Sequence, residues 1–313
     1  MAGVGLRVRL ATLDEARGIT EVHCSDVEQW VRAASGRGEP AEYEELSVED
    51  RYLHGGPWMS VETCAVHLNY VLTSGQYALV AELDGRVVGE LELYVGEERG
   101  VLGRTAYIDV LVVHKDFRRR GVGRALVSEA RRLAVEEGCD TLSVWPEADA
   151  IPFYEKCGVR SVAYRVAHFV VAPDKATEGA TAEVEPLPHE YSCVRGSWLI
   201  SPRTWSSAAA WLKCRWPLAL RVAKSTVDEG RIPSLSATFI LGAVERDGLD
   251  CWLTLWLDDP GLLPSALSAI CERARAAGCR RLHVLVDEQL ASKVTSLRAS
   301  LVQRELVLFE RLG

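Results

Sequence analysis

The chain has 313 residues, of which 48% are hydrophobic and 26% charged, and its formal net charge is −8. This composition is that of a globular protein and excludes the disordered and fibrous classes, while the length favours two domains over one large domain. The negative charge argues against a nucleic-acid binder, whose affinity comes largely from neutralising phosphates, and suits an amine-bearing or cationic partner better.

In the first half, a strand is predicted over residues 6–11. Thr12 to Glu15 then forms a capping box, which should start a helix running to about Val31. Residues 35–57 are rich in Gly, Pro and Glu and show no clear period. The remaining pattern predicts a helix, a hairpin turning at Asp84-Gly85, a strand, a helix, a strand, a short helix and a strand, over residues 60–72, 77–95, 105–113, 120–137, 142–145, 149–156 and 161–171. This order is typical of an α+β fold.

A change of composition divides the chain. Residues 173–188 hold three prolines among Ala, Thr and Glu, which is linker composition. We therefore predict domains over residues 1–172 and 189–313, joined by a linker over 173–188. In the second domain the pattern predicts a helix, two strands, a helix, a strand, a helix and a strand, near residues 204–214, 236–244, 250–257, 264–277, 281–286, 288–300 and 302–310.

The two halves share an internal similarity. A shift of 140 positions superposes the last four elements of the second half on those of the first. Identities at this shift include Gly121 with Gly261, Gly138 with Gly278, Cys139 with Cys279, and Val144 with Val284. The agreement in element order and length indicates a diverged duplication. The alternative is an unrelated α/β lobe that shares a helix-Gly-Cys-strand pattern.

One segment carries a chemical signal. Between the strand 105–113 and the following helix lies Arg-Arg-Arg-Gly-Val-Gly-Arg, residues 118–124. Its glycines allow the backbone to approach a ligand closely, and the N–H groups and dipole of a helix N-terminus favour an anion. With four arginines added, a diphosphate is the natural guest. Leu126 rules out the dinucleotide motif G-x-G-x-x-G, and no P-loop Lys-Ser/Thr follows. A solvated, arginine-rich helix start is the alternative.

The context of this segment is similar to a known family. The stretch from Tyr77 to Val171, with R-x-x-G-x-G and then Ala-Ile-Pro-Phe-Tyr-Glu-Lys-Cys-Gly at 150–158, resembles the GNAT superfamily of acyl-CoA-dependent N-acetyltransferases. With the opening strand and helix included, the resemblance covers residues 6–171. It implies an α+β fold with a GNAT-type mixed sheet flanked by helices, followed here by a second, degenerate GNAT-like domain. It also implies acetyl-CoA as cosubstrate and no metal.

The resemblance assigns roles residue by residue. Tyr154 would give a proton to the departing thiolate. Backbone groups of Leu111, Val112 and Val113 would face the pantetheine arm and the thioester. The coenzyme A diphosphate would be held by Arg118, Arg119, Arg120, Gly121, Val122, Gly123 and Arg124. The sequence departs from the family pattern at Lys115, Glu147 and Val159, where the family often has Pro, Asn and Phe.

The acceptor amine, with a pKa near 10, must lose a proton before or during attack. Strand alternation places Glu90, Glu92 and Tyr94 on one face, and Asp109 on the same face of the next strand as Leu111 and Val113. We take Glu92 and Asp109 as candidate bases. A solvated sheet face and deprotonation through water are the alternatives.

Six carboxylates between residues 39 and 50 lie among the aromatic residues Trp30, Tyr43, Tyr52 and Trp58. This mixture suits a cationic amine but also describes a plain solvated surface. At the shift of 140, Arg118, Arg119 and Arg120 fall on Asp258, Asp259 and Pro260, and Tyr154 falls on Val294. Two carboxylates would repel a diphosphate. The second domain is therefore expected to be catalytically silent and to pack on the first, close the acceptor cleft or mediate dimerisation.

The longest uncharged apolar stretch, residues 232–244, is too short to span a bilayer, and Arg7 and Arg9 interrupt any signal-peptide core. The nine cysteines form no C-x-x-C pair, so we expect reduced thiols in a cytoplasmic protein without membrane or nucleic-acid contacts. The expected function is transfer of an acetyl group to a small or cationic amine by direct attack in a ternary complex. A non-enzymatic acyl-CoA sensor and a protein or peptide N-acetyltransferase are the alternatives.

Overall fold

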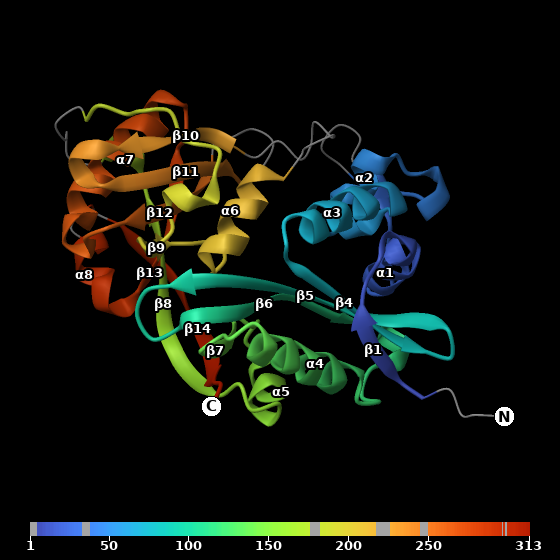
Figure 1. Ribbon diagram of the computed structural model, residues 1–313. Coiled ribbons are helices and arrows are strands. Elements are labelled where there is room, and N and C mark those ends of the chain that lie inside the picture. Colours follow the sequence, from blue (N-terminus) through green and yellow to red (C-terminus); the bar gives the residue numbers. More distant parts are fainter. Residues whose placement is uncertain are drawn as a thin grey trace. The chain divides into compact units, whose positions relative to one another are not determined.

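The computed structural model describes residues 5–32, 38–175, 182–216, 226–244, 250–295, 297 and 299–313. The chain divides into two compact units (Figure 1). The first lies within residues 1–94, 108–137 and 216–223, and the second within 95–107, 138–215 and 224–313. Strands β5 (Arg86–Glu98) and β6 (Gly103–Val113) contribute residues to both units. Residues 176–181 of the predicted linker lie outside the described part of the chain.

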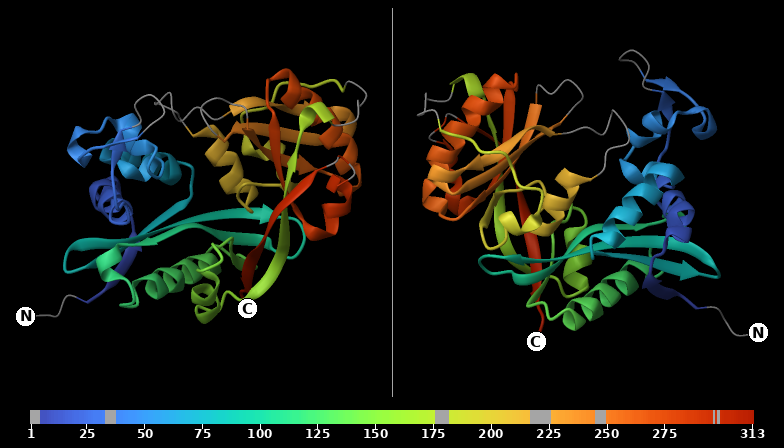
Figure 2. Two further views of the ribbon diagram at one scale, coloured as in Figure 1. Left: turned by 180° about the vertical axis from the view of Figure 1, so that it is seen from behind. Right: turned by 45° about the horizontal axis from the view of Figure 1, so that its top comes forward.

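The first unit is a sheet with helices on both faces. The other elements of this unit are β1 (Arg7–Leu10), α1 (Ala16–Cys24), β2 (Val31–Arg32), β3 (Glu39–Pro40), α2 (Val48–Tyr52), α3 (Val61–Thr73), β4 (Tyr77–Leu83) and α4 (Val122–Glu136). The strand order is β1-β4-β5-β6, and β4 is antiparallel to both β1 and β5. Helices α1 and α3 cover one face of these strands and α4 covers the other (Figures 1 and 2).

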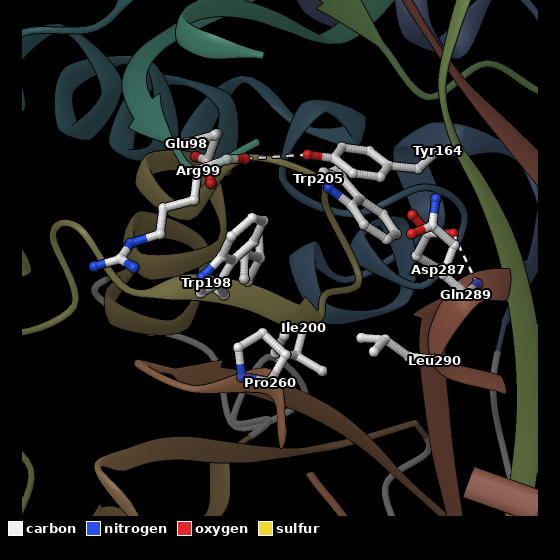
Figure 3. Close-up of a pocket in the computed structure, with 11 residues that line it drawn as sticks. Glu98, Arg99, Tyr164, Trp198, Ile200, Trp205, Pro260, Asp287, Gln289 and Leu290 are labelled. Carbon is white, nitrogen blue, oxygen red and sulfur yellow. Dashed lines mark hydrogen bonds between the residues drawn. The ribbon is translucent and has the colours of Figure 1, made fainter. Parts of the chain in front are cut away.

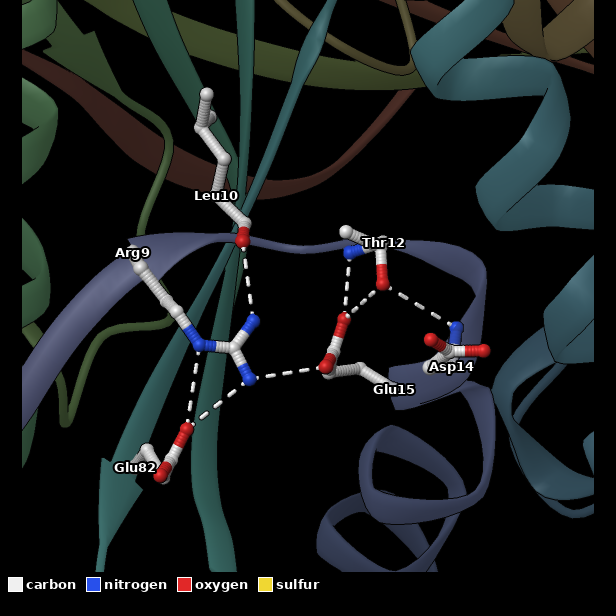
Figure 4. Close-up of polar contacts among 6 residues, drawn as sticks. All are labelled: Arg9, Leu10, Thr12, Asp14, Glu15 and Glu82. Atoms are coloured by element: carbon white, nitrogen blue, oxygen red, sulfur yellow. Dashed lines mark hydrogen bonds and ion pairs between the residues drawn. The ribbon is translucent and has the colours of Figure 1, made fainter. Parts of the chain in front are cut away.

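The predicted capping box is confirmed at the start of the first helix. The Thr12 hydroxyl accepts a hydrogen bond from the Asp14 N–H, and Glu15 accepts one from the Thr12 N–H (Figure 4). Arg9 joins Glu15 to Glu82 at 2.9 and 3.0 Å. The predicted end at Val31 is wrong, because α1 stops at Cys24. The Ser25 hydroxyl donates to Val22 O at 2.7 Å and accepts from the Lys115 N–H, so its side chain competes with helix continuation.

The second unit contains the remaining elements. They are β7 (Thr141–Val144), α5 (Ile151–Lys156), β8 (Ser161–Val171), β9 (Trp198–Ser201), α6 (Ser207–Arg215), β10 (Thr226–Ile232), β11 (Ala237–Ala243), β12 (Asp250–Leu257), α7 (Leu263–Ala276), β13 (Arg281–Asp287), α8 (Ala291–Thr295) and β14 (Ser300–Arg311). The strand order is β7-β14-β8-β13-β12-β11-β10, with β9 paired to β12. β12 and β13 are parallel, whereas the other strand pairs described in this unit are antiparallel. The predicted mixed sheet with flanking helices is confirmed.

Two differences from the predicted elements have local causes. β9 and β10 were not predicted, because neither short segment alternates polar and apolar residues. The helix predicted over 288–300 is shorter: a 3₁₀ turn over Glu288–Leu290 precedes α8, and Ser300 already opens β14. Residues 296 and 298 of that prediction lie outside the described residues.

The element bounds repeat at the predicted shift. Equivalent bounds 140 positions apart are the ends of α4 and α7 at Glu136 and Ala276, the starts of β7 and β13 at Thr141 and Arg281, and the starts of α5 and α8 at Ile151 and Ala291. The last strands of the two repeats, β8 and β14, are exchanged. β8 pairs with β13 of the second repeat, and β14 pairs with β7 of the first. Each repeat is thus completed by the other's last strand.

Successive side chains of β11 are buried on opposite faces of the sheet in the second unit. Phe239 and Leu241 enter the core beneath α7, while Ile240 packs with Trp211 of α6 and Trp256 of β12. Among the described residues, Trp211 and Trp256 are the largest fully buried side chains. Within the described ranges, no helix is long and apolar enough to cross a membrane.

Glu98 fixes the start of α6 and should make the stability depend on pH. Its two carboxylate oxygens accept hydrogen bonds from the Ser207 N–H at 2.5 Å and the Ser207 hydroxyl at 2.8 Å. Burial nevertheless raises the pKa of Glu98 to about 7. The folded state therefore holds this proton up to a higher pH than the unfolded state does. The resulting stabilisation is complete below about pH 4.5 and is lost as the pH rises through about 7.

As the pH rises from 4.5 to 8, we expect the free energy of unfolding of Glu98→Gln to increase relative to that of wild type by roughly 2–3 kcal/mol, because glutamine cannot ionise. Denaturant unfolding of both proteins at several pH values measures this difference. Burial lowers the pKa of His168 to about 4, which makes a contribution to stability of the opposite pH dependence. Both proteins share this contribution, so it cancels in the comparison. If the free energies of unfolding of the two proteins changed with pH in parallel, this pH dependence would not come from Glu98.

Candidate active site

The segment 118–124 opens helix α4 through an unusual backbone. His114 accepts a hydrogen bond from the Asp116 N–H through Nδ1 at 3.2 Å, which closes a 3₁₀ turn over Lys115–Phe117. Gly121 follows as the N-cap residue of α4 with φ of 85°, and Arg119 also has a positive φ, of 61°. The predicted helix start at Arg120 is therefore two residues early. A left-handed residue at 121 favours glycine and brings the chain into the helix.

The N-terminus of α4 is seated directly on β5. A Cβ atom added to Gly89 would lie 3.0 Å from Val122 Cγ1 and 3.1 Å from Leu126 Cδ1. Val122 and Leu126 are buried, and α4 is 15 residues long. The first N–H groups of such a helix have no intrahelical partner and carry the positive end of its dipole. A fixed helix start of this kind can bind an anion.

The four arginines of the segment are exposed. Arg118 is used in part by the protein itself: its Nε donates to Val113 O at 3.1 Å, and its guanidinium pairs with Asp26. The guanidinium of Arg120 lies 5.3 Å from the ring centroid of Phe117. Arg119 and Arg124 flank the helix start. The backbone of Leu111, Val112 and Val113, half-buried at the end of β6, leads into this segment.

A buried polar network lies beneath α1 and α3. Glu92 Oε1 accepts hydrogen bonds from Trp58 Nε1 at 2.9 Å and from His67 Nε2 at 2.7 Å, and Oε2 accepts one from the Tyr94 hydroxyl at 3.0 Å. Glu90 contacts His23 Nε2 at 2.5 Å. Glu90, Glu92 and Tyr94 share one face of β5, as predicted. The alternative of a solvated face is wrong, since both carboxylates are 1% exposed.

The two carboxylates have different protonation behaviour. Burial alone would raise the pKa of Glu92, but the charge of His67 and three hydrogen bonds lower it to about 2. Burial raises the pKa of Glu90, and the neighbouring His23 only partly opposes this. Glu92 therefore stays ionised and is a weak proton acceptor. It is better suited to orienting His67 than to removing a proton itself.

Asp109 lies on β6, half-buried. Together with Glu92 it raises the pKa of the Tyr94 phenol, after the larger effect of burial. The structure thus brings Asp109 and Glu92 into one electrostatic environment around Tyr94.

Aromatic rings surround the histidines of this network. Trp58 stacks on His23, with ring centroids 5.1 Å apart, and meets His67 edge-on at 5.0 Å. The ring centroid of Trp216 lies 6.0 Å from that of His67, and Trp216 stacks on Tyr52 with centroids 6.2 Å apart. The Nε1 atom of Trp216 is buried and has no hydrogen-bond partner in the described structure. An indole N–H in this state can donate to a ligand.

The acidic segment before Trp58 is mostly solvated. Glu39, Glu42, Glu44, Glu45 and Glu49 are exposed. The ring of Tyr43 is covered by the guanidinium of Arg51, 4.0 Å from its centroid. An external cation therefore cannot use that face of Tyr43. Trp58 and Trp216 contact the polar network through His67, and Tyr52 stacks on Trp216.

Tyr154 lies on α5 in the second unit, whereas the other predicted site residues lie in the first. It is 6% exposed, and its ring meets that of Phe153 at 5.0 Å. Burial, with a smaller effect from Cys157, raises the pKa of its phenol. The hydroxyl therefore keeps its proton at neutral pH and can act as a proton donor. In the described part of the chain, no cluster of three or more His, Cys, Asp or Glu could hold a metal ion.

Residues 38–159 match the family described as the acetyltransferase (GNAT) family. The likeness to the GNAT family thus lies in this segment of the chain. An acetyltransferase of Pectobacterium atrosepticum is 33% identical over 87 residues, which are 27% of this chain and 57% of the relative. Glucosamine 6-phosphate N-acetyltransferase of Trypanosoma brucei brucei is 31% identical over 78 residues, 25% of this chain and 53% of the relative. The chain thus spans about half the length of these curated relatives.

Solved structures show the same GNAT fold. A GCN5-related N-acetyltransferase from Anabaena variabilis has a TM-score of 0.63 at 12% identity, over 97% of this chain and 72% of that one. A tandem GNAT protein from the clavulanic acid biosynthesis pathway has a TM-score of 0.50 at 16% identity, over 98% and 99% of the two chains. At these identities the likeness concerns the fold alone.

Sequence reasoning missed the histidines of the site. His67 shares a helix face with Cys64, Leu68 and Val71, all of which are buried. A histidine within an apolar stripe of period 3.6 predicts a buried imidazole. The partner of that imidazole, Glu92, could not be identified from this pattern, because it lies on a strand 25 residues away.

Proposed function

We propose that this GNAT chain transfers an acetyl group from acetyl-CoA to an amine by direct attack in a ternary complex. The observation that carries the proposal is the start of α4, where a left-handed glycine, the first N–H groups of the helix and exposed arginines lie together. This combination supports the binding of a diphosphate. Residues 118–124 bind the diphosphate, and the backbone of Leu111, Val112 and Val113 binds the pantetheine arm. In this proposal the two domains are residues 1–172 and 189–313, joined by a linker over 173–188.

The chemistry requires two proton transfers. The amine nitrogen attacks the thioester carbonyl carbon, the C–S bond breaks, and the thiolate takes a proton from the Tyr154 hydroxyl. The raised pKa of Tyr154, caused mainly by burial, supports this role. The proton of the amine passes to the neutral imidazole of His67, whose Nε2–H donates to Glu92, with Asp109 as the alternative base. This arrangement makes Glu92 a positioning residue.

The acceptor amine lies beside Trp58, Tyr52 and Trp216 in this proposal. Rings of this kind attract a cationic group, and the unpartnered Nε1 of Trp216 can donate to an oxygen of the acceptor. The support is that the rings of Trp58 and Trp216 contact His67 and that Tyr52 stacks on Trp216, which favours a small or cationic amine. The second domain, with Asp258 and Asp259 at the positions equivalent to Arg118 and Arg119, is proposed to be catalytically silent.

Glu92→Gln tests the positioning role. It keeps the shape of the side chain and removes the charge that stabilises a protonated imidazole. We expect kcat/KM for the amine to fall about 10- to 100-fold and the acidic limb of its pH profile to move to lower pH by about one unit. Asp109→Asn is the matched comparison, expected to leave the position of that limb unchanged. If Asp109→Asn moves the limb and Glu92→Gln does not, Asp109 is the base.

The activity itself is tested by thiol release from acetyl-CoA with polyamines, amino acids, aminoglycosides and peptides as acceptors. Release with small or cationic amines is expected. Release with peptides alone would favour a protein or peptide N-acetyltransferase. No release with any acceptor, despite measurable coenzyme binding, would favour an acyl-CoA sensor.

A further inference from the structure

The second unit contains a cavity of about 240 Å³ that the transfer reaction does not use. Its walls come from the turn after β5, from β8 and β9, and from the segments that follow β12 and β13 (Figure 3). The side chains that decide its chemistry are Tyr164, Trp198, Trp205 and Asp287. All of them belong to the second unit.

The aromatic walls are held in place by the surrounding chain. Tyr164 and Trp205 are stacked, with centroids 4.5 Å apart and ring planes inclined by 22°. The Tyr164 hydroxyl donates to Arg99 O at 3.2 Å. A Cβ atom on Gly100, whose φ is 86°, would lie 3.0 Å from that hydroxyl and 3.2 Å from Trp198. These rings therefore form a preorganised surface rather than one that must collapse around a ligand.

One carboxylate of the cavity has no charged partner. Asp287 is half-buried and accepts a hydrogen bond from the Gln289 N–H at 3.1 Å, and among the described residues it forms no ion pair. Glu98 is engaged through both oxygens by Ser207. Figure 3 shows the guanidinium of Arg99 pointing away from the cavity, and its Nε donates to Gly196 O. Asp287 thus carries the negative charge available to a ligand.

The duplication explains why a cavity lies here. At the shift of 140, Pro260 corresponds to Arg120 of the diphosphate turn, and Asp287 corresponds to Glu147 before α5. Two of the lining residues therefore correspond to the coenzyme side of the first repeat. In this repeat Asp258 and Asp259 replace two arginines. The replacements remove cationic groups that would hold a diphosphate, so an anion does not fit here.

We propose that this cavity binds a small organic ammonium ion, with its charged head at Asp287 and its alkyl groups against the rings of Trp198, Trp205 and Tyr164. Aromatic faces attract ammonium groups through their quadrupoles, and tryptophan does so most strongly. A carboxylate at the end of the aromatic surface adds direct charge complementarity. The site requires neither acetyl-CoA nor the first unit's catalytic residues. Its existence can therefore be tested independently of the transfer reaction.

The test is a calorimetric titration of the full chain, without acetyl-CoA, with choline and with its uncharged isostere 3,3-dimethylbutan-1-ol. We expect choline to bind at least about tenfold more tightly than the alcohol. Asp287→Asn should weaken choline binding about tenfold, and Trp198→Leu should weaken binding of both compounds. Asp258→Asn is the matched control, because it removes a nearby exposed carboxylate outside the cavity, and it should change the affinity less than twofold.

A second measurement needs no variant to fold. In nitrogen-15 NMR spectra of the wild type, choline should shift the indole N–H signals of Trp198 and Trp205 and leave that of Trp58, which belongs to the first unit, unchanged. Equal affinity for choline and the alcohol would assign the cavity to an apolar ligand and overturn the proposal. It would also be overturned by the absence of heat and of signal shifts up to about 10 mM choline, or by a loss of affinity in Asp258→Asn equal to that in Asp287→Asn.

Discussion

Tyr154→Phe is expected to lower kcat about 10²- to 10³-fold while leaving the Kd for acetyl-CoA within about twofold of wild type. Phenylalanine keeps the buried ring and its contact with Phe153, so the helix α5 should remain folded. Only the hydroxyl is lost, and with it the proton that the departing thiolate takes. Thiol-release kinetics and calorimetry, carried out on the same preparation, measure the two quantities separately.

Tyr77→Phe is the matched control for this change. The Tyr77 hydroxyl donates to Glu137 at the far end of α4 from the diphosphate turn, and no proposed step uses it. Its kcat should stay within about twofold of wild type. If Tyr154→Phe keeps full kcat, the tyrosine is only a core residue. If kcat and coenzyme affinity fall together, its role is in binding.

The second large effect is expected at the diphosphate turn. Arg119, Arg120 and Arg124 are exposed and flank the start of α4, so replacing all three by glutamate places like charges around a bound diphosphate. We expect the Kd for acetyl-CoA to rise at least about 100-fold at low salt, and the difference to narrow as salt screens the charges. Arg118 is left in place because its contacts with Val113 and Asp26 also hold the loop.

The control reverses charge elsewhere on the same helix. Arg131 and Arg132 lie in the later turns of α4, away from its N-terminus. Their replacement by glutamate changes the net charge of the chain in the same direction but should leave the Kd for acetyl-CoA within about twofold of wild type. A similar loss of affinity in both variants would mean that the coenzyme responds to the overall charge of the chain and not to this turn.

Local signals in the sequence predicted much of the fold. The Asp84-Gly85 turn has positive φ at both residues, as a two-residue hairpin requires, and β8 has the predicted bounds. The exchange of β8 and β14 could not be predicted. Both strands are equivalent in the repeat, so either could pair with β7 or β13, and the choice depends on contacts between residues more than a hundred positions apart.

The candidate site also has one part that the sequence predicts and one part that it does not. The diphosphate turn is a continuous motif, so glycines and arginines at fixed spacing indicate it directly. The proton-transfer network joins His67 to Glu92 and His23 to Glu90, residues 25 and 67 positions apart. Strand alternation placed both carboxylates on one face but could not show what covers them. Their burial beneath α1 and α3 makes Glu92 an anchor for His67, a role that its sequence position does not reveal.

The measurement that most directly tests this account is a calorimetric titration of the full chain with coenzyme A. The account predicts saturable uptake of one equivalent per chain, because residues 118–124 form a diphosphate turn and Asp258-Asp259 excludes one from the second repeat. Uptake of two equivalents, or no uptake at all, would contradict it.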